Sequence, residues 1–180
     1  MGATSAFMPM ARLVDEIIRL TVAGLDPGRM QELLASTLVE PASLDAYVRF
    51  EPGRYTRHLV HKSAEVEILV LCWARVERGT LSFTDYQEVS RQPLHVTPMG
   101  PASVGGPGHL DGPTDLHAVE NPRDLGRPAV SLQVYARPYD ECDIYDLEEG
   151  TVRRVRLRYD SVPATLRMPI TPPPGEAGSR

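Results

Sequence analysis

Apolar residues in the first fifty positions recur at helical spacing. Between residues 13 and 22 they return every three or four positions, a pattern typical of an amphipathic helix, and Gly24 then ends the segment. The same spacing predicts a second helix over residues 30–39 and a third over residues 41–50. We therefore expect two or three packing helices at the N-terminal end of the chain.

After residue 53 the pattern changes to that of strands. Residues 66–73, VEILVLCW, are almost continuously apolar, which indicates a strand buried on both faces. Residues 75–89 alternate and predict a hairpin that turns at residues 78–79, whereas residues 92–114 are rich in proline and glycine and predict a loop. Further strands are predicted over residues 116–120, 129–135, 143–146 and 152–159, with a turn at 149–150.

Many short strands behind a helical segment predict a mainly β fold, and a jelly-roll β-barrel of the cupin type suits this order. The 180 residues, of which 42% are hydrophobic and 24% charged, are enough for one domain with a core. We predict a single domain over residues 1–170. It comprises a helical layer over residues 1–50 and a barrel over residues 51–161, and residues 171–180 are expected to form a disordered tail.

Charge and cysteine content exclude several classes of partner and location. The net charge of −5 leaves no basic footprint for nucleic acid, and no apolar run is long enough to cross a membrane. Two cysteines are too few for a disulfide scaffold, and the N-terminus does not read as a secretory signal. We expect a cytoplasmic protein that acts as a monomer on a small molecule.

The segment over residues 129–135 is the first with candidate chemistry. Its period of two places Ser131, Gln133 and Tyr135 on one face and the intervening valines and leucine on the other. Hydrogen-bonding groups that point inward would line the polar cavity of a barrel. The alternative is a half-exposed strand whose polar face is solvated.

Arg57 and His117 are further candidates, each with an alternative. Arg57 follows a strand-like start and could bind a carboxylate through two parallel hydrogen bonds, or it could be a surface residue. His117 begins an apolar strand, where it is either a ligand or a hydrogen-bonded core residue. His58 and His61 are three positions apart, which on a strand puts them on opposite faces and makes them a poor metal pair.

Five blocks of the sequence carry a resemblance to a known family. They are YTRHLV at 55–60, LVLCW at 69–73, LHAVENP at 116–122, AVSLQVYARPYDECDIYD at 129–146 and VRRVRLRYDS at 152–161. In this order they resemble the cysteine dioxygenase family, which comprises thiol dioxygenases with the cupin fold. The stretch over residues 116–146 is long and specific enough to make chance similarity improbable.

The resemblance implies an iron(II) enzyme that uses O2 to oxidise the thiol of cysteine to cysteine sulfinic acid. Members of the family hold the iron through three histidines, and His117 matches the third of them. Arg57 matches the arginine that pairs with the substrate carboxylate, and Tyr55 matches its neighbour in the pocket. Ser131 and Tyr135 match the ends of a Ser-x-His-x-Tyr relay beside the iron.

The chain departs from this family in two places. The His-Asp-His segment that supplies the other two iron ligands is missing after residues 72–73, where about twenty residues are absent. Gln133 stands at the central histidine of the relay, and an amide cannot shuttle a proton. Three hypotheses remain open: a cysteine dioxygenase, a metal-free cupin that serves as a binding or interaction module, and a dioxygenase for another small thiol acid.

Overall fold

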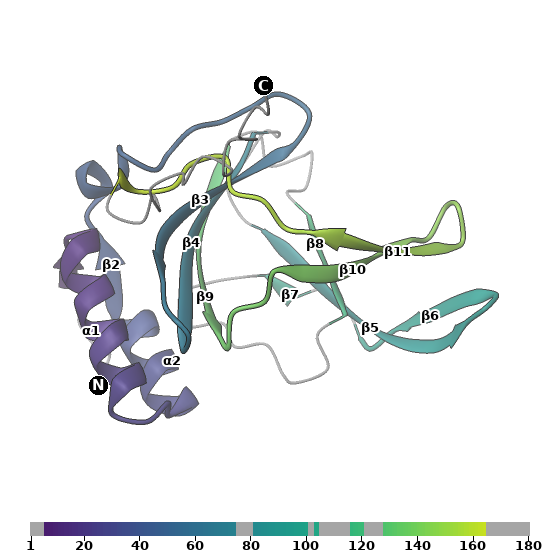
Figure 1. Ribbon diagram of the computed structural model, residues 1–180, viewed down its shortest axis with the longest axis horizontal. Coiled ribbons are helices and arrows are strands. Elements are labelled where there is room, and N and C mark those ends of the chain that lie inside the picture. Colours follow the sequence, from purple (N-terminus) through teal and green to yellow (C-terminus); the bar gives the residue numbers. More distant parts are fainter. Residues whose placement is uncertain (1–5, 75–80, 101–102, 105–115, 121–127, 165–180) are drawn as a thin grey trace, which may run out of the picture.

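The computed structural model of the chain describes residues 6–74, 81–100, 103–104, 116–120 and 128–164. It is mainly β, with mostly antiparallel sheets behind two N-terminal helices, as the sequence predicts (Figure 1). The predicted turn at residues 78–79 and the predicted tail at 171–180 lie outside the described residues. None of the described helices is long and apolar enough to span a membrane.

The two helices are α1, Met10–Val22, and α2, Pro27–Ser36. Helix α2 begins where the side chain of Asp26 accepts hydrogen bonds from the backbone N–H groups of Gly28 and Arg29, at 2.9 and 3.2 Å. This N-cap satisfies donors that the first helical turn leaves free, and proline at the first helical position fits the same site.

Two of the helix predictions are corrected by the structure. The second helix ends at Ser36 instead of residue 39, because β2, Thr37–Val39, pairs in parallel with β1, Ala6–Met8. The predicted third helix is only a 3-10 turn over Pro41–Leu44. In both places a contact with a distant segment or a short local turn prevails over helical spacing.

The first sheet contains β3, Tyr55–Lys62, β4, Val66–Trp73, and β9, Ala129–Ala136, in the antiparallel order β3-β4-β9. Strand β4 lies in the centre and is buried almost throughout, as its apolar run predicts. One face of this sheet is covered by the helices (Figure 1). The core on that side contains Leu13 and Ile17 of α1 together with Ile68, Val70 and Cys72 of β4.

The second sheet is built on β5, Ser82–Arg91, which pairs with β6, Leu94–Pro98, β7, Ser103–Val104, and β8, His117–Glu120. The prediction of a loop throughout residues 92–114 is therefore wrong for β6 and β7. Their few apolar residues give a weak strand signal, and pairing with the long strand β5 supplies what local sequence does not.

The last two strands, β10, Glu141–Asp146, and β11, Thr151–Arg156, form a hairpin. Gly150 adopts a positive φ of 66° in the predicted turn, a conformation that glycine reaches without steric cost. The predicted strand over residues 152–159 ends early, at Arg156, because the residues that follow leave β10 and run back to β3.

The two larger sheets meet through a small apolar cluster. It joins Leu81 and Phe83, at the start of the second sheet, to Ala129 and Trp73 of the first, with Val119 of β8 packed beside them. The first sheet therefore has its helices on one face and the second sheet on the other. This arrangement is consistent with a cupin-like β fold.

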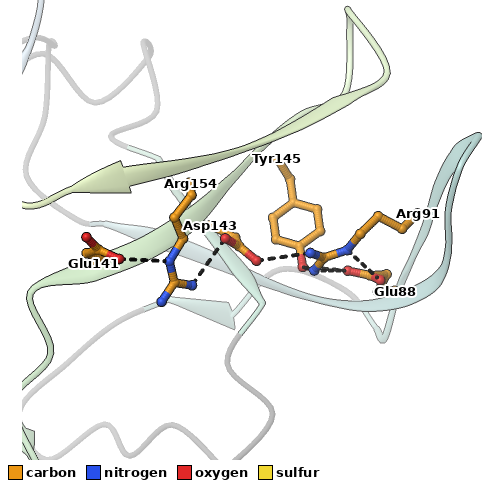
Figure 2. A network of polar contacts seen from close by, with 6 residues as sticks. All are labelled: Glu88, Arg91, Glu141, Asp143, Tyr145 and Arg154. Carbon is orange, nitrogen blue, oxygen red and sulfur yellow. Dashed lines mark hydrogen bonds and ion pairs between the residues drawn. The ribbon is translucent and has the colours of Figure 1, made fainter.

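Away from this cluster, hairpins β5–β6 and β10–β11 are linked by a network of charged groups (Figure 2). The guanidinium of Arg91 on β5 donates to the Tyr145 hydroxyl at 2.8 Å and to Asp143 at 3.2 Å, and both of these residues belong to β10. Asp143 also accepts from Arg154 of β11 at 3.2 Å, and the Tyr145 hydroxyl donates to Glu88 of β5 at 2.5 Å.

Candidate functional site

The inner face of the β3–β4–β9 sheet, on the side away from the helices, carries most of the predicted site residues. Arg57 pairs with Leu71 on β4, and Leu71 pairs in turn with Ser131 on β9. Residues in register on neighbouring strands share a face, so these three side chains form a row across the sheet. Tyr135 lies four positions from Ser131 on the same strand and on the same face.

Arg57 is a buried cation on this inner face. Arg57 is only 9% exposed, and its Nε has no hydrogen-bond acceptor in the described part of the chain. A guanidinium carries hydrogen-bond donors and no acceptor, and a buried donor without a partner costs free energy. A carboxylate could supply the missing acceptor, and the carboxylate-binding role that the resemblance implies for Arg57 stays a prediction.

The ring of Trp73 organises one end of the inner face. Its Nε1–H donates to the Ser131 hydroxyl at 3.0 Å, and the Gln133 amide donates to the same oxygen at 3.1 Å. The indole also stacks on Tyr55, with ring centroids 4.9 Å apart. Ser131, Gln133 and Tyr55 thus form a connected group around Trp73, a residue that the sequence analysis placed on a strand but not in the site.

Tyr135 lies among apolar residues at the other end of the face. It packs against the cluster of Leu59, Leu69 and Leu71, and its ring meets that of Tyr139 edge-on at 5.6 Å. Burial raises the pKa of Tyr135 well above its usual value, and the positive charge of Arg57 offsets only part of this effect. The phenol is therefore neutral at physiological pH and can donate a hydrogen bond.

Directly across from Tyr135 in the register is Glu67, a carboxylate that sequence analysis missed. It is 1% exposed, yet it accepts a hydrogen bond from the Tyr159 hydroxyl and pairs with the Lys62 ammonium at 3.2 Å. Lys62 also reaches Tyr159 and Asp140, each at 2.8 Å. A glutamate inside the apolar run VEILVLCW was the available signal, because acidic residues are rarely buried without partners.

His117 lies on the second sheet. It begins β8, opposite Asp85 of β5, and its ring is 6.3 Å from the ring of Phe83. Phe83 packs in the same cluster as Trp73, so the described contacts connect His117 to the inner face only indirectly. The structure thus brings Arg57, Ser131 and the aromatic residues onto one face, whereas His117 approaches from the opposite sheet.

The described residues do not fit the iron site that the resemblance implies. Nowhere in the described ranges do three His, Cys, Asp or Glu side chains gather closely enough to hold a metal ion. His58 is buried on the helical side and hydrogen-bonds Ser161 and Thr56, and His95 is exposed on β6, so neither accompanies His117. His117 is the one member of the implied ligand set within the described residues.

The class that the structure shows is a mainly β, cupin-like fold whose inner sheet face carries a buried, partly unpaired arginine. Comparison with curated proteins gives a narrower result. The chain is 24% identical to cysteine dioxygenase type 1 of Rattus norvegicus over 79% of this chain and 80% of that protein. The identity is 22% for the Homo sapiens protein and 24% for that of Danio rerio, over 73% and 72% of this chain. No protein-family model matches the chain.

The lengths of these matches show that the alignment contains gaps in this chain. The match to the Rattus norvegicus protein runs over 162 positions, but 79% of this 180-residue chain is only about 142 residues. The alignment therefore includes about twenty positions at which this chain has no residue, the difference between 162 and 142. A deficit of this size agrees with the segment that sequence analysis finds missing after residues 72–73.

Proposed function

We propose that the chain is a thiol dioxygenase-like protein whose ligand is cysteine. In the proposed reaction both atoms of O2 are added to the sulfur of a thiol R–SH, giving the sulfinic acid R–SO2H with no other reductant consumed. The observation that carries the proposal is Arg57, a buried guanidinium with an unpaired Nε on the inner face, together with the similarity to cysteine dioxygenases.

The residues of the inner face have separate roles in this proposal. Arg57 binds the carboxylate of cysteine and so fixes the orientation of the amino acid. Tyr55, stacked on Trp73, borders the bound ligand. Tyr135 offers a neutral hydroxyl that donates a hydrogen bond to the bound cysteine. Gln133 holds Ser131 in place by a hydrogen bond but moves no proton.

Two measurements on the purified protein test the proposal: its iron content, and the formation of cysteine sulfinic acid from L-cysteine under air. We expect the wild type to form cysteine sulfinic acid and Arg57→Ala to reduce its formation at least tenfold through a higher KM. The iron content shows whether a metal accompanies this activity. Arg57→Lys keeps the charge but loses the planar pair of donors, so it should recover only part of the affinity. Product formation that is unchanged in Arg57→Ala would contradict the assigned role of this residue.

A second candidate is a metal-free binding module, which is favoured by the lack of a three-donor group among the described residues. Calorimetry on chelator-treated protein distinguishes the two candidates. A metal-free module should bind L-cysteine with unchanged heat after chelation and form no sulfinate. No heat with L-cysteine or with a mercapto-carboxylic acid would count against both candidates, whereas heat with the mercapto-carboxylic acid alone would favour another small thiol acid as the ligand.

A further inference from the structure

The outer edge of β3 is covered by a segment from the C-terminal end of the described chain. Strand β3 has β4 on one side, and on the other side Asp160 and Ser161 lie alongside it. The Leu59 N–H donates to the Ser161 carbonyl at 3.0 Å, and His58 forms a parallel bridge with Ser161. The His58 ring also hydrogen-bonds the Ser161 hydroxyl at 2.8 Å, which fixes the segment in register with β3.

Within this segment, Asp160 satisfies both backbone groups of Arg57. The Arg57 N–H donates to Oδ2 of Asp160 at 2.8 Å, and the Asp160 N–H donates to the Arg57 carbonyl at 2.7 Å. The second carboxylate oxygen, Oδ1, accepts from Arg54 at 2.5 Å. Hydrogen bonding from Arg54 holds the pKa of Asp160 below its usual value, so the carboxylate stays ionised at neutral pH.

The backbone of Arg57 has an unusually large part in positioning its guanidinium. Its Nε makes no hydrogen bond within the described residues, so the side chain is held by packing and by the peptide from which it projects. A binding group that is displaced by even a fraction of an ångström loses much of its affinity for a planar ligand such as a carboxylate. The contact that anchors this peptide comes from a residue 103 positions away in sequence.

We propose that Asp160 is a positioning residue for Arg57 and that it thereby sets the preference of the site for thiols that carry a carboxylate. This inference rests on the proposed function for its ligand. It assigns Asp160 no contact with the ligand, because Asp160 acts through the backbone of Arg57.

Binding of two thiols under anaerobic conditions tests the proposal, with fluorescence of Trp73, the single tryptophan of the chain, as the readout. L-cysteine has a carboxylate and cysteamine lacks it. We expect Asp160→Ala to weaken L-cysteine about tenfold and to leave cysteamine unchanged, as loss of a charge-assisted hydrogen bond at the anchor implies. Asp160→Asn keeps one oxygen acceptor for the Arg57 N–H and should therefore lose less affinity for L-cysteine. This variant provides the test if Asp160→Ala does not fold.

Asp143→Ala is the matched control. Asp143 has the same side-chain exposure as Asp160, 24%, and also bonds two arginines, but it lies on β10 and does not touch Arg57. Its removal should leave the affinity for both thiols at the wild-type value. Equal weakening in the Asp143 and Asp160 variants, or equal loss of L-cysteine and cysteamine in Asp160→Ala, would overturn the proposal.

A second measurement does not depend on the ligand. Phenylglyoxal modifies accessible guanidinium groups, and mass spectrometry of peptides reports its rate at Arg57. We expect slow labelling in the wild type, several-fold faster labelling in Asp160→Ala, and no change in Asp143→Ala. If the wild type binds no cysteine but labelling accelerates as expected, the proposed function fails and the positioning role stands. Unchanged labelling in Asp160→Ala and Asp160→Asn would refute the positioning role.

Discussion

Two ionisable side chains on the inner face of the β3–β4–β9 sheet are almost completely buried, and their surroundings differ. Glu67 has both a cation, Lys62, and a hydroxyl donor, Tyr159, within hydrogen-bonding reach. Arg57 has an Nε with no acceptor in the described chain. Burial of a charge is costly unless it is paired, so Glu67 is a structural group, whereas Arg57 is the group to which the proposed function assigns a ligand.

This difference leads to a prediction for Glu67. Glu67→Ala leaves Lys62 and Tyr159 without their shared acceptor and should lower the free energy of unfolding by about 3 kcal/mol. The control is Glu65→Ala, one position before β4. Its carboxylate is exposed and, among the described residues, accepts a hydrogen bond only from Ser63. Urea denaturation measures both variants, and equal stability of the two would show that the buried pair is not a structural contact.

At the scale of elements, helix α1 and the central strand β4 form the apolar core. Leu13 and Ile17 of α1 are at most 1% exposed and contact the face of β4 that carries Ile68 and Val70. This packing covers the outer face of the sheet and leaves the inner face to the candidate site. The position of α1 therefore contributes to the site without touching it.

Leu13→Ala should reduce the free energy of unfolding by about 3 kcal/mol, since it removes a buried side chain and leaves a cavity. Leu25→Ala, at a leucine that is 41% exposed, is the matched control and should cost less than about 1 kcal/mol. Denaturant unfolding followed by fluorescence of Trp73 compares the two variants. A Leu13 variant as stable as the Leu25 variant would contradict the core assignment.

At the scale of the whole molecule, hairpins β5–β6 and β10–β11 are held together by charged groups on the surface (Figure 2). Hydrogen bonding from Arg154 lowers the pKa of Asp143, and hydrogen bonding from Arg91 lowers that of Glu88. A lowered pKa in the folded state adds stability above the unfolded pKa of about 4, and this stability is lost as pH falls through the lowered value.

Arg91→Ala removes the centre of this network. Hydrogen exchange of the β10–β11 amides should then be faster than in the wild type at low salt, and high salt should remove the difference, because salt screens exposed ion pairs. The variant should also lose less stability than the wild type below about pH 4. Arg153→Ala, at an exposed arginine on β11 outside the network, should match the wild type, and a similar change in both would exclude the network as its cause.

The sequence by itself determined the features that depend on neighbouring residues. Helical spacing located α1, the apolar run located β4, and alternation on β9 put Ser131 and Tyr135 on one face. Each of these follows from the period of a helix or a strand, which any short window of sequence contains.

Only the tertiary structure decided which distant segments meet. Thr37 is predicted in a helix but lies in a strand, because it pairs with β1. Strand β6 lies in a stretch predicted as a loop and forms because it pairs with β5. The same is true of Glu67 with Tyr159 and of Arg57 with Asp160, which are separated by 92 and 103 positions. No local pattern contains such contacts, because their free energy is gained only when the chain has folded and the two segments are already held side by side.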